Sequence, residues 1–197
     1  MGATSHGSVR VEGGKYERAE AGVYPARCIQ VVELGQQEVT FKGETKIAKQ
    51  LMIVWELSEL MQDGRPFVVS WKGTNSLNEK SALFKMLSSW RGRPFTNEEL
   101  AKFELKNILD KECMVNVTKE TAASGKDYNK VVSVMPMPKG MKCEPRVNDL
   151  VDFGIDDYPS GDFDKLYPYV KDIILKSKEV MKRERDNEIA SEPNEAF

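Results

Sequence analysis

The sequence has almost no histidine and little cysteine, and both shortages narrow its chemistry. One histidine, His6, and three cysteines, Cys28, Cys113 and Cys143, occur in 197 residues. Hydrolases of the Ser-His-Asp or Cys-His kind and histidine-rich zinc sites need a positioned imidazole, which the Gly- and Ser-rich surroundings of His6 do not offer. The cysteine spacing fits neither a disulfide framework nor a CxxC metal site. We therefore expect reduced cysteines, two of them on buried strands, and no catalytic residue, metal or cofactor.

Long apolar runs are missing too. A membrane-spanning helix takes about 20 mostly apolar residues, and the sequence contains no such run. Residues 1–21 lack the apolar stretch of a secretory signal and are expected to be flexible. The sequence therefore predicts a cytoplasmic protein with no membrane partner.

Charge is unevenly distributed along the chain. Residues 143–197 contain 8 Lys or Arg and 14 Asp or Glu, whereas residues 1–142 contain 21 and 17. The net charges are therefore −6 and +4. A mildly basic body with an acidic arm is typical of a domain that binds a polyanion.

Apolar spacing between residues 22 and 141 predicts three strands, a helical stretch and two more strands. Residues 23–34, 44–57 and 66–72 have strand character, and the alternation within 44–57 indicates one buried face. Helical spacing follows, and strand character returns at 113–119 and 129–135. We predict a mainly β (α+β) fold with the order of an OB-fold, a five-stranded barrel with a helical insert between strands 3 and 4. Another five-stranded barrel or an α+β sandwich has the same pattern.

The composition changes after residue 141. Residues 142–162 are rich in Gly, Pro and Asp and predict a linker or, around 151–155, an edge strand. Residues 163–185 carry an apolar stripe at helical spacing and predict a C-terminal helix. Residues 186–197 have no periodicity and predict a disordered acidic tail.

Aromatic residues next to basic ones are the candidate nucleic-acid contacts, because single strands stack on rings at about 1–3 kcal/mol per base while Lys and Arg meet phosphates. Phe41 and Tyr128 lie in polar loops, where no apolar pattern explains them. Trp71 is either a contact or a core residue, and Trp55 and Trp90 follow apolar stripes and belong to the core. The predicted nucleic-acid-binding residues are Phe41, Lys42, Trp71, Lys72, Arg91, Arg93, Lys126, Tyr128 and Lys130.

Two groups of charged residues have a second explanation. Arg91 and Arg93 flank Gly92 at the end of the predicted helix, so they cap the helix, meet phosphates, or do both. Four carboxylates raise the alternative of a Mg²⁺-dependent nuclease, although their spacing is irregular and no Lys or His partner stands in a recognisable motif. They are Asp149, Asp152, Asp156 and Asp157.

The final residues combine acidic groups with one large ring. Glu192, Glu195 and Phe197 lie in an otherwise polar segment. A small apolar pocket rimmed by Lys or Arg on a partner protein binds such a ring and its carboxylate together. We therefore predict that these three residues bind a partner protein.

Residues 22–57, 63–117 and 131–141, from GVYPARCIQVVEL to VVSVMPMPKGM, resemble a group of tailed-phage and prophage proteins. That group consists of OB-fold single-stranded-DNA-binding proteins encoded near recombination functions. The acidic segment ending in Phe197 is similar to the tips through which bacterial and phage single-stranded-DNA-binding proteins recruit replication and repair enzymes. The resemblance implies DNA binding in the cytoplasm of a bacterial host cell.

The sequence thus predicts a non-enzymatic, sequence-independent single-stranded-DNA-binding protein of phage DNA replication and recombination. Its partners are single-stranded DNA and, through the tail, replication or recombination proteins. The alternative is an OB-fold interaction module that binds a host factor or defence component without DNA. The choices between DNA and RNA and between monomer and homo-oligomer stay open.

Overall fold

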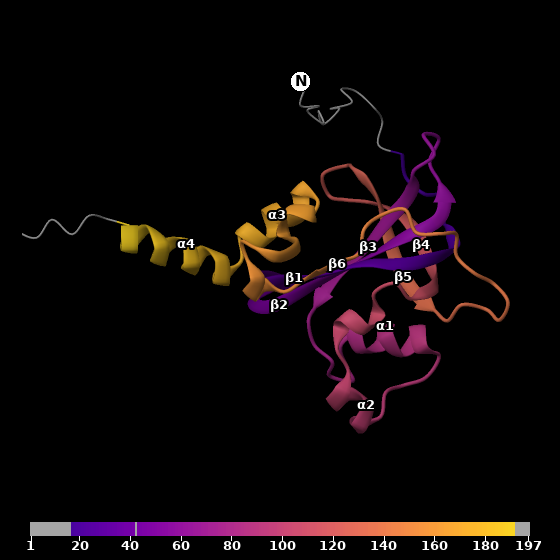
Figure 1. Cartoon of the computed structure of the whole chain (residues 1–197), viewed down its shortest axis with the longest axis horizontal. Helices are drawn as coiled ribbons and strands as arrows, with labels where there is room; N and C mark the ends of the chain where they lie inside the picture. The colour runs from indigo at the N-terminus through magenta and orange to yellow at the C-terminus, as the bar shows by residue number, and fades with distance from the viewer. Residues whose placement is uncertain (1–16, 42, 192–197) are drawn as a thin grey trace, which may run out of the picture.

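A six-stranded sheet forms the centre of the computed structural model, which describes residues 17–41 and 43–191 (Figure 1). Five strands have the order β3-β2-β1-β4-β5 with antiparallel neighbours, and β6 adds in parallel to β1. The strands are β1 (Gly22–Phe41), β2 (Glu44–Leu60), β3 (Pro66–Thr74), β4 (Glu112–Thr121), β5 (Asp127–Met135) and β6 (Val151–Phe153).

Helices occupy two places in the chain. The insert between β3 and β4, which the sequence predicted, contains α1 (Ala82–Arg91), α2 (Asn97–Lys102) and the 3₁₀ turn η1 (Leu105–Ile108). After β6 come the 3₁₀ turns η2 (Ile155–Asp157) and η3 (Gly161–Lys165) and the helices α3 (Pro168–Leu175) and α4 (Lys178–Ser191). Figure 1 shows the insert on one side of the sheet and α3 and α4 on the other.

The five predicted strands and the helical insert between strands 3 and 4 are present, but the sheet is not closed into a barrel. The outer strands β3 and β5 touch each other, but within the described residues no hydrogen-bonded ladder joins them. The sheet also has a sixth strand, β6, because β1 is long enough to pair with three other strands. It pairs with β4 over its first residues, with β6 in its middle and with β2 over most of its length. Register shifts in β1 at Cys28/Gln30 and Glu33/Gly35 bend it and change which side chains face each side.

The sheet face toward α1 carries the insert-side core. Ser81 caps α1 by accepting the N–H of Phe84, and Gly92 ends the helix in the left-handed region at φ 74°. The helix presents Trp90 to Trp55 of β2, with ring centroids 5.9 Å apart. The principal residues of this core are Ala26, Cys28, Val31, Leu51, Ile53, Trp55, Leu57, Phe67, Val69, Leu83, Leu87, Trp90, Cys113, Val115, Val117, Val131 and Val134. All three cysteines are free thiols, and Cys28 and Cys113 are buried as expected.

The opposite face carries a second core, which overturns the prediction that β2 buries only one face. Residues 50–57 are all buried, because the segment after β5 covers the side that the alternation had left to solvent. This C-terminal core consists of Ile29, Val32, Leu34, Met52, Val54, Val151, Phe153, Ile155, Leu166, Val170, Ile174 and Val180. Full burial of each large apolar side chain contributes about 1.5–3 kcal/mol. The second core is therefore a substantial part of the folding energy.

Residues 142–150 form a strap that leads from β5 to β6 and is held by the carboxylate of Glu56. That side chain is only 6% exposed. It accepts the backbone N–H groups of Val147 and Asn148 at 2.9 and 2.8 Å and the Asn148 side-chain amide at 2.6 Å. A buried carboxylate is costly unless hydrogen bonds replace its water. The strap supplies those bonds, so the carboxylate and the strap stabilise each other.

The single C-terminal helix predicted for residues 163–185 is instead broken in two places. Pro168 starts α3 as its first residue. Ser177 then separates α3 from α4, and its hydroxyl accepts the N–H of Val180 at 3.3 Å. Ser177 is fully buried against the bare backbone of Gly35. Close packing on a strand residue without a side chain therefore accompanies the second break.

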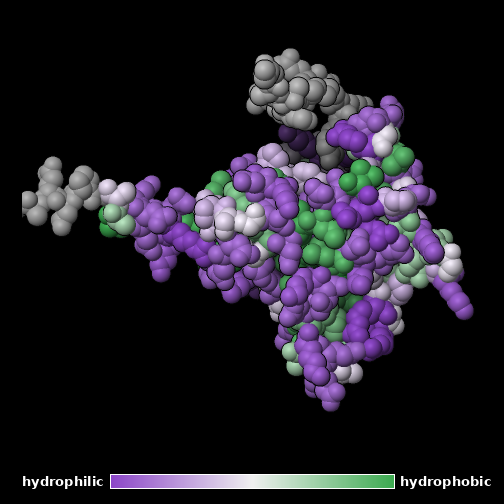
Figure 2. All heavy atoms as spheres, viewed as in Figure 1, coloured by the Kyte–Doolittle hydropathy of each residue, from purple (hydrophilic) through white to green (hydrophobic). Residues whose placement is uncertain are grey.

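Helix α4 projects from the body (Figure 1). The Arg183 guanidinium anchors its first half by donating to the carbonyl oxygens of Asp156 and Tyr158 at 3.2 and 3.0 Å. Figure 2 shows that the projecting helix is mostly hydrophilic, with a hydrophobic group near its far end. Residues 186–191, predicted as part of the disordered tail, are helical, and residues 192–197 lie outside the described residues.

The contact at Gly35 gives a stability prediction. A Cβ at this position, where φ is +72°, meets the Ser177 Cβ at 2.7 Å. We expect Gly35→Ala to lower the free energy of unfolding by about 2–4 kcal/mol, combining backbone strain with overpacking. Gly64→Ala is the matched control, since φ is +82° and no heavy atom lies within 4 Å. It should cost only the strain, about 1–2 kcal/mol. Urea unfolding measures both, and equal losses contradict the packing argument.

Candidate nucleic-acid interface

The turn between β4 and β5 brings three predicted contacts together. Lys126, Tyr128 and Lys130 are exposed, and Tyr128 and Lys130 both bind Glu120. The Tyr128 hydroxyl donates to one carboxylate oxygen at 2.9 Å, and the Lys130 Nζ lies 2.8 Å from the other. The bond to Glu120 raises the pKa of the Tyr128 hydroxyl, and the ammonium of Lys130 lowers the pKa of Glu120. The hydroxyl of Tyr128 is tethered to Glu120. The residue is nevertheless 41% exposed, so part of its surface remains open for stacking.

The β1–β2 hairpin holds two further candidates. Phe41 is the last residue of β1, and its backbone pairs with that of Glu44. Lys42 lies outside the described residues. The hairpin backbone extends beyond the C-terminal core, because residues 44–47 at the start of β2 are exposed.

Trp71 and Lys72 point to opposite faces of β3. Trp71 pairs with Ile53 and packs against the insert-side core. Its ring covers Gly73, where a Cβ would lie 2.3 Å from it. Most of the Trp71 side chain is therefore packed against the insert-side core, as the core interpretation predicted. Lys72 pairs with Met52 on the other face and is exposed.

Arg91 and Arg93 are both held by Glu99. Each guanidinium places an Nη2 atom 2.6 Å from Oε1 of Glu99, and the same carboxylate accepts the N–H of Thr96 at 2.9 Å. The hydrogen bonds from Arg93, Arg91 and Thr96 hold the pKa of Glu99 well below its usual range. Arg91 also lies over the Phe95 ring at 4.0 Å. This Glu99 clamp joins α1 to α2 and leaves the two arginines with a structural role first.

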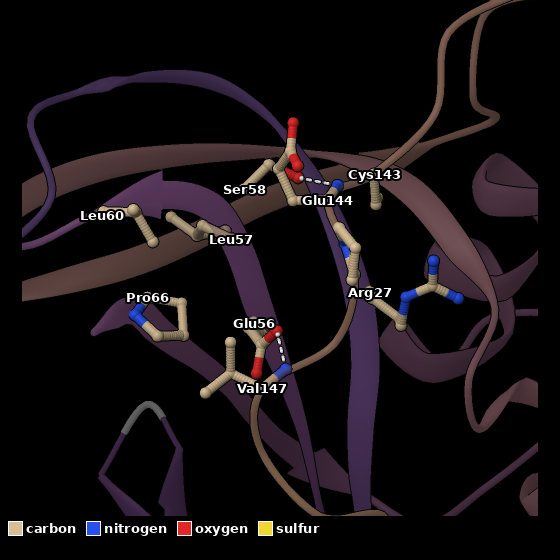
Figure 3. A pocket seen from close by; sticks show the side chains of 10 residues that line it. Arg27, Glu56, Leu57, Ser58, Leu60, Pro66, Cys143, Glu144 and Val147 are labelled. Carbon is tan, nitrogen blue, oxygen red and sulfur yellow. Dashed lines mark hydrogen bonds between the residues drawn. The ribbon is translucent and has the colours of Figure 1, made fainter. Parts of the chain in front are cut away.

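Two hollows accompany these elements. A cavity of about 20 Å³, room for a water molecule, lies under the strap (Figure 3). In Figure 3 the N–H groups of Val147 and Glu144 donate to Glu56 and Ser58 at its wall. A wider hollow of about 410 Å³ lies open beside the Glu99 clamp. Its lining residues are Arg91, Phe95, Glu98, Glu99, Lys102, Phe103 and Asn107.

Two of the acidic candidates have different surroundings. Asp156 pairs with Arg183 at 3.1 Å, and burial raises the pKa of Asp152. Within residues 17–41 and 43–191, no group of three or more His, Cys, Asp or Glu side chains is arranged to hold a metal ion. The predicted partner-binding residues Glu192, Glu195 and Phe197 lie outside this part of the chain.

The predicted contacts therefore do not form one continuous site. The β4–β5 turn gathers one group, Lys72 lies alone on β3, and the two arginines lie in the clamp. Sequence reasoning missed the counter-charges Glu120 and Glu99. Glu99 follows Thr96 by three residues, the spacing of the capping box that the structure contains, and this spacing gives no sign that Glu99 also reaches both arginines.

Neither a known family model nor a curated protein sequence matches this chain. Among the helices that the structure describes, none is long and apolar enough to cross a membrane.

The Glu99 clamp predicts a pH dependence of stability. The pKa of Glu99 is lower in the folded than in the unfolded chain, so its stabilisation is complete above the unfolded pKa, about 4.3. It then declines as the pH falls toward the folded pKa. We expect Glu99→Gln to be less stable than the wild type at pH 7, and the difference to narrow at pH 3. Urea unfolding at both pH values tests this, with Glu98→Gln as the control from the same turn.

Proposed function

We propose that this chain binds single-stranded DNA without sequence preference, in phage DNA replication and recombination. In this proposal it is an OB-type protein that catalyses no reaction, and its acidic C-terminal residues recruit replication or recombination proteins. The likeness of residues 22–141 to phage single-stranded-DNA-binding proteins supports the biological setting.

The observation that carries the proposal is the strand order. An OB-fold is a partly open Greek-key barrel of five strands. The order β3-β2-β1-β4-β5, with β3 against β5 and the helical insert between β3 and β4, fits that description. The missing ladder between β3 and β5 is consistent with the partly open form.

The positions of the loops support it further. OB-folds bind oligonucleotides with the face of strands 2 and 3 and with the loops joining strands 1–2 and 4–5. The second of these loops here lies beside Tyr128, with Lys126 and Lys130 around it. The first follows Phe41 and contains Lys42. The ring and ammonium groups at the β4–β5 loop suit a strand that stacks its bases and aligns its phosphates, and the sequence provides a Phe and a Lys at the β1–β2 loop as well.

The C-terminal core limits the part of the β2–β3 face that remains available to DNA. Met52 and Val54 of β2 are 3% and 0% exposed, because the segment after the strap covers them. Lys72, one strand further out, stays exposed. We therefore place the DNA along the uncovered rim, from β3 to the β4–β5 turn.

Tyr128 tests the stacking step. We expect Tyr128→Ala to weaken binding of an oligo-dT by about 1–3 kcal/mol, the contribution of one stacked base. Tyr128→Phe keeps the ring and loses only the bond to Glu120, so it should bind nearly as well as the wild type. Fluorescence anisotropy of a labelled oligonucleotide measures both affinities.

The same assay in a salt series tests the phosphate contacts. Wild-type affinity should fall steeply with salt because binding releases counterions, and Lys126→Ala should reduce the magnitude of the logarithmic slope by about one. Lys85→Ala, on the exposed side of α1, is the control and should leave the slope unchanged. If the wild type does not bind oligo-dT at low salt, the proposed function is wrong.

The acidic C-terminal residues give a further prediction, about DNA affinity. Deleting residues 192–197 removes Glu192, Glu195 and Phe197. Because Glu192 and Glu195 repel phosphates, DNA affinity should rise or stay the same after the deletion. A clear loss of DNA affinity in the anisotropy assay contradicts the assignment of these residues to partner proteins.

One observation favours the alternative of a protein-interaction module. Glu99 pairs with both Arg91 and Arg93, and Glu120 pairs with Lys130, so two of these three positive charges predicted to meet phosphates are compensated. A surface with fewer uncompensated cations attracts polyanions less. The salt series separates the two functions, because an interaction module shows no binding to DNA at low salt.

A further inference from the structure

A pair of stacked tyrosines stands at the start of α3, outside the residues predicted to contact nucleic acid. Tyr167 and Tyr169 flank Pro168, and their rings are nearly parallel, with centroids 6.0 Å apart and planes at 11°. Tyr167 packs partly against the C-terminal core. Tyr169 is 50% exposed, so part of the outer ring remains accessible to solvent.

The pair lies above β2, next to Lys72 of β3. The Tyr169 hydroxyl is 4.0 Å from Sδ of Met52, and Met52 pairs directly with Lys72. Side chains that oppose each other in an antiparallel pair share one face, with Cβ atoms about 4.5–5.5 Å apart. Lys72 has no ion pair among the described residues, in contrast to Arg91, Arg93 and Lys130. An exposed ring and an uncompensated ammonium group therefore lie side by side.

A neighbouring tyrosine shows what a structural ring looks like in this part of the chain. Tyr158 meets Phe163 edge to face, with centroids 5.0 Å apart and planes at 89°, and its hydroxyl donates to Glu184 at 3.1 Å. Tyr158 also packs against the C-terminal core. Tyr169 differs from Tyr158 in its exposure, since half of its surface is accessible to solvent. A half-exposed aromatic ring is the kind of surface on which a nucleobase stacks.

Resting on the proposed function, we propose that Tyr169, backed by Tyr167, is a stacking site for one base of the single strand, and that Lys72 binds a phosphate beside it. The C-terminal segment covers Met52, which belongs to the OB face used for oligonucleotides, and places Tyr169 over it. The segment thus replaces the covered surface with a ring of its own. The strand then passes from this ring and Lys72 toward the β4–β5 turn.

Three variants of the full chain test the site with fluorescein-labelled oligo-dT. Tyr169→Ala should weaken binding about 5- to 100-fold, the range for one lost stack. Tyr169→Leu still covers Met52 but lacks the flat ring, and it should lose as much. Tyr169→Phe should bind within about twofold of the wild type. Urea unfolding accompanies each variant, and the expected free energies of unfolding are close to that of the wild type.

Two further measurements separate stacking from charge. Lys72→Ala should reduce the magnitude of the salt slope by about one, whereas Tyr169→Ala should leave the slope unchanged. An abasic oligonucleotide of the same length keeps its phosphates, so Tyr169→Ala should bind it as the wild type does. An equal loss on the abasic and the dT strands overturns the stacking assignment.

The outcomes distinguish this site from the function it rests on. If the wild type binds oligo-dT and both Tyr169→Ala and Tyr169→Leu bind within twofold of it, the stacking site is wrong and the proposed function stands. If the wild type does not bind at low salt, both fail. Loss of binding in Tyr169→Leu with unchanged stability, and retention in Tyr169→Phe, support the site.

Discussion

Residues 50–57 of β2 are buried from both sides, and the segment that follows β5 covers the second side. Without that segment, Met52, Val54 and the neighbouring apolar residues of β1 would face water. The strap can lie there because Glu56 accepts its backbone N–H groups. Residues 22–141 alone would thus expose an apolar face and a carboxylate that now shares hydrogen bonds with the strap. The sheet and its C-terminal cover are one folding unit in energetic terms.

Outside the C-terminal cover, charged side chains also hold the structure together. On one side the Glu99 clamp uses Arg91 and Arg93 to hold α2 against α1. On the other, Glu120 positions Tyr128 while it neutralises Lys130. These ion pairs order the Glu99 clamp and the β4–β5 turn, and they use cations that a polyanion would otherwise contact. In the proposed function, a bound strand would therefore depend more on rings and on the few uncompensated cations than the sequence suggested.

The strands and the helical insert were predictable because each follows from local periodicity. Burial of the second face of β2 was not predictable. Met52 and Val54 alternate with residues of the insert-side core, and only the distant segment around Phe153 and Val170 buries them. The break at Ser177 depends likewise on Gly35, which is far away in sequence. Of the candidate contacts, the exposure of Tyr128 could be predicted from its polar surroundings. The roles of Arg91 and Arg93 depended on the side-chain reach of Glu99, which spacing alone does not give.

Helix α4 sets the distance between the sheet and the residues after Ser191. Its last contacts with the body are those of Arg183 and Glu184. The helix runs on to Ser191, which at 1.5 Å per residue adds about 10 Å. A hydrophilic helix of this kind serves as a rigid spacer. In the proposed function, a partner protein that binds beyond α4 would be kept clear of the sheet, so that both surfaces could be occupied at the same time.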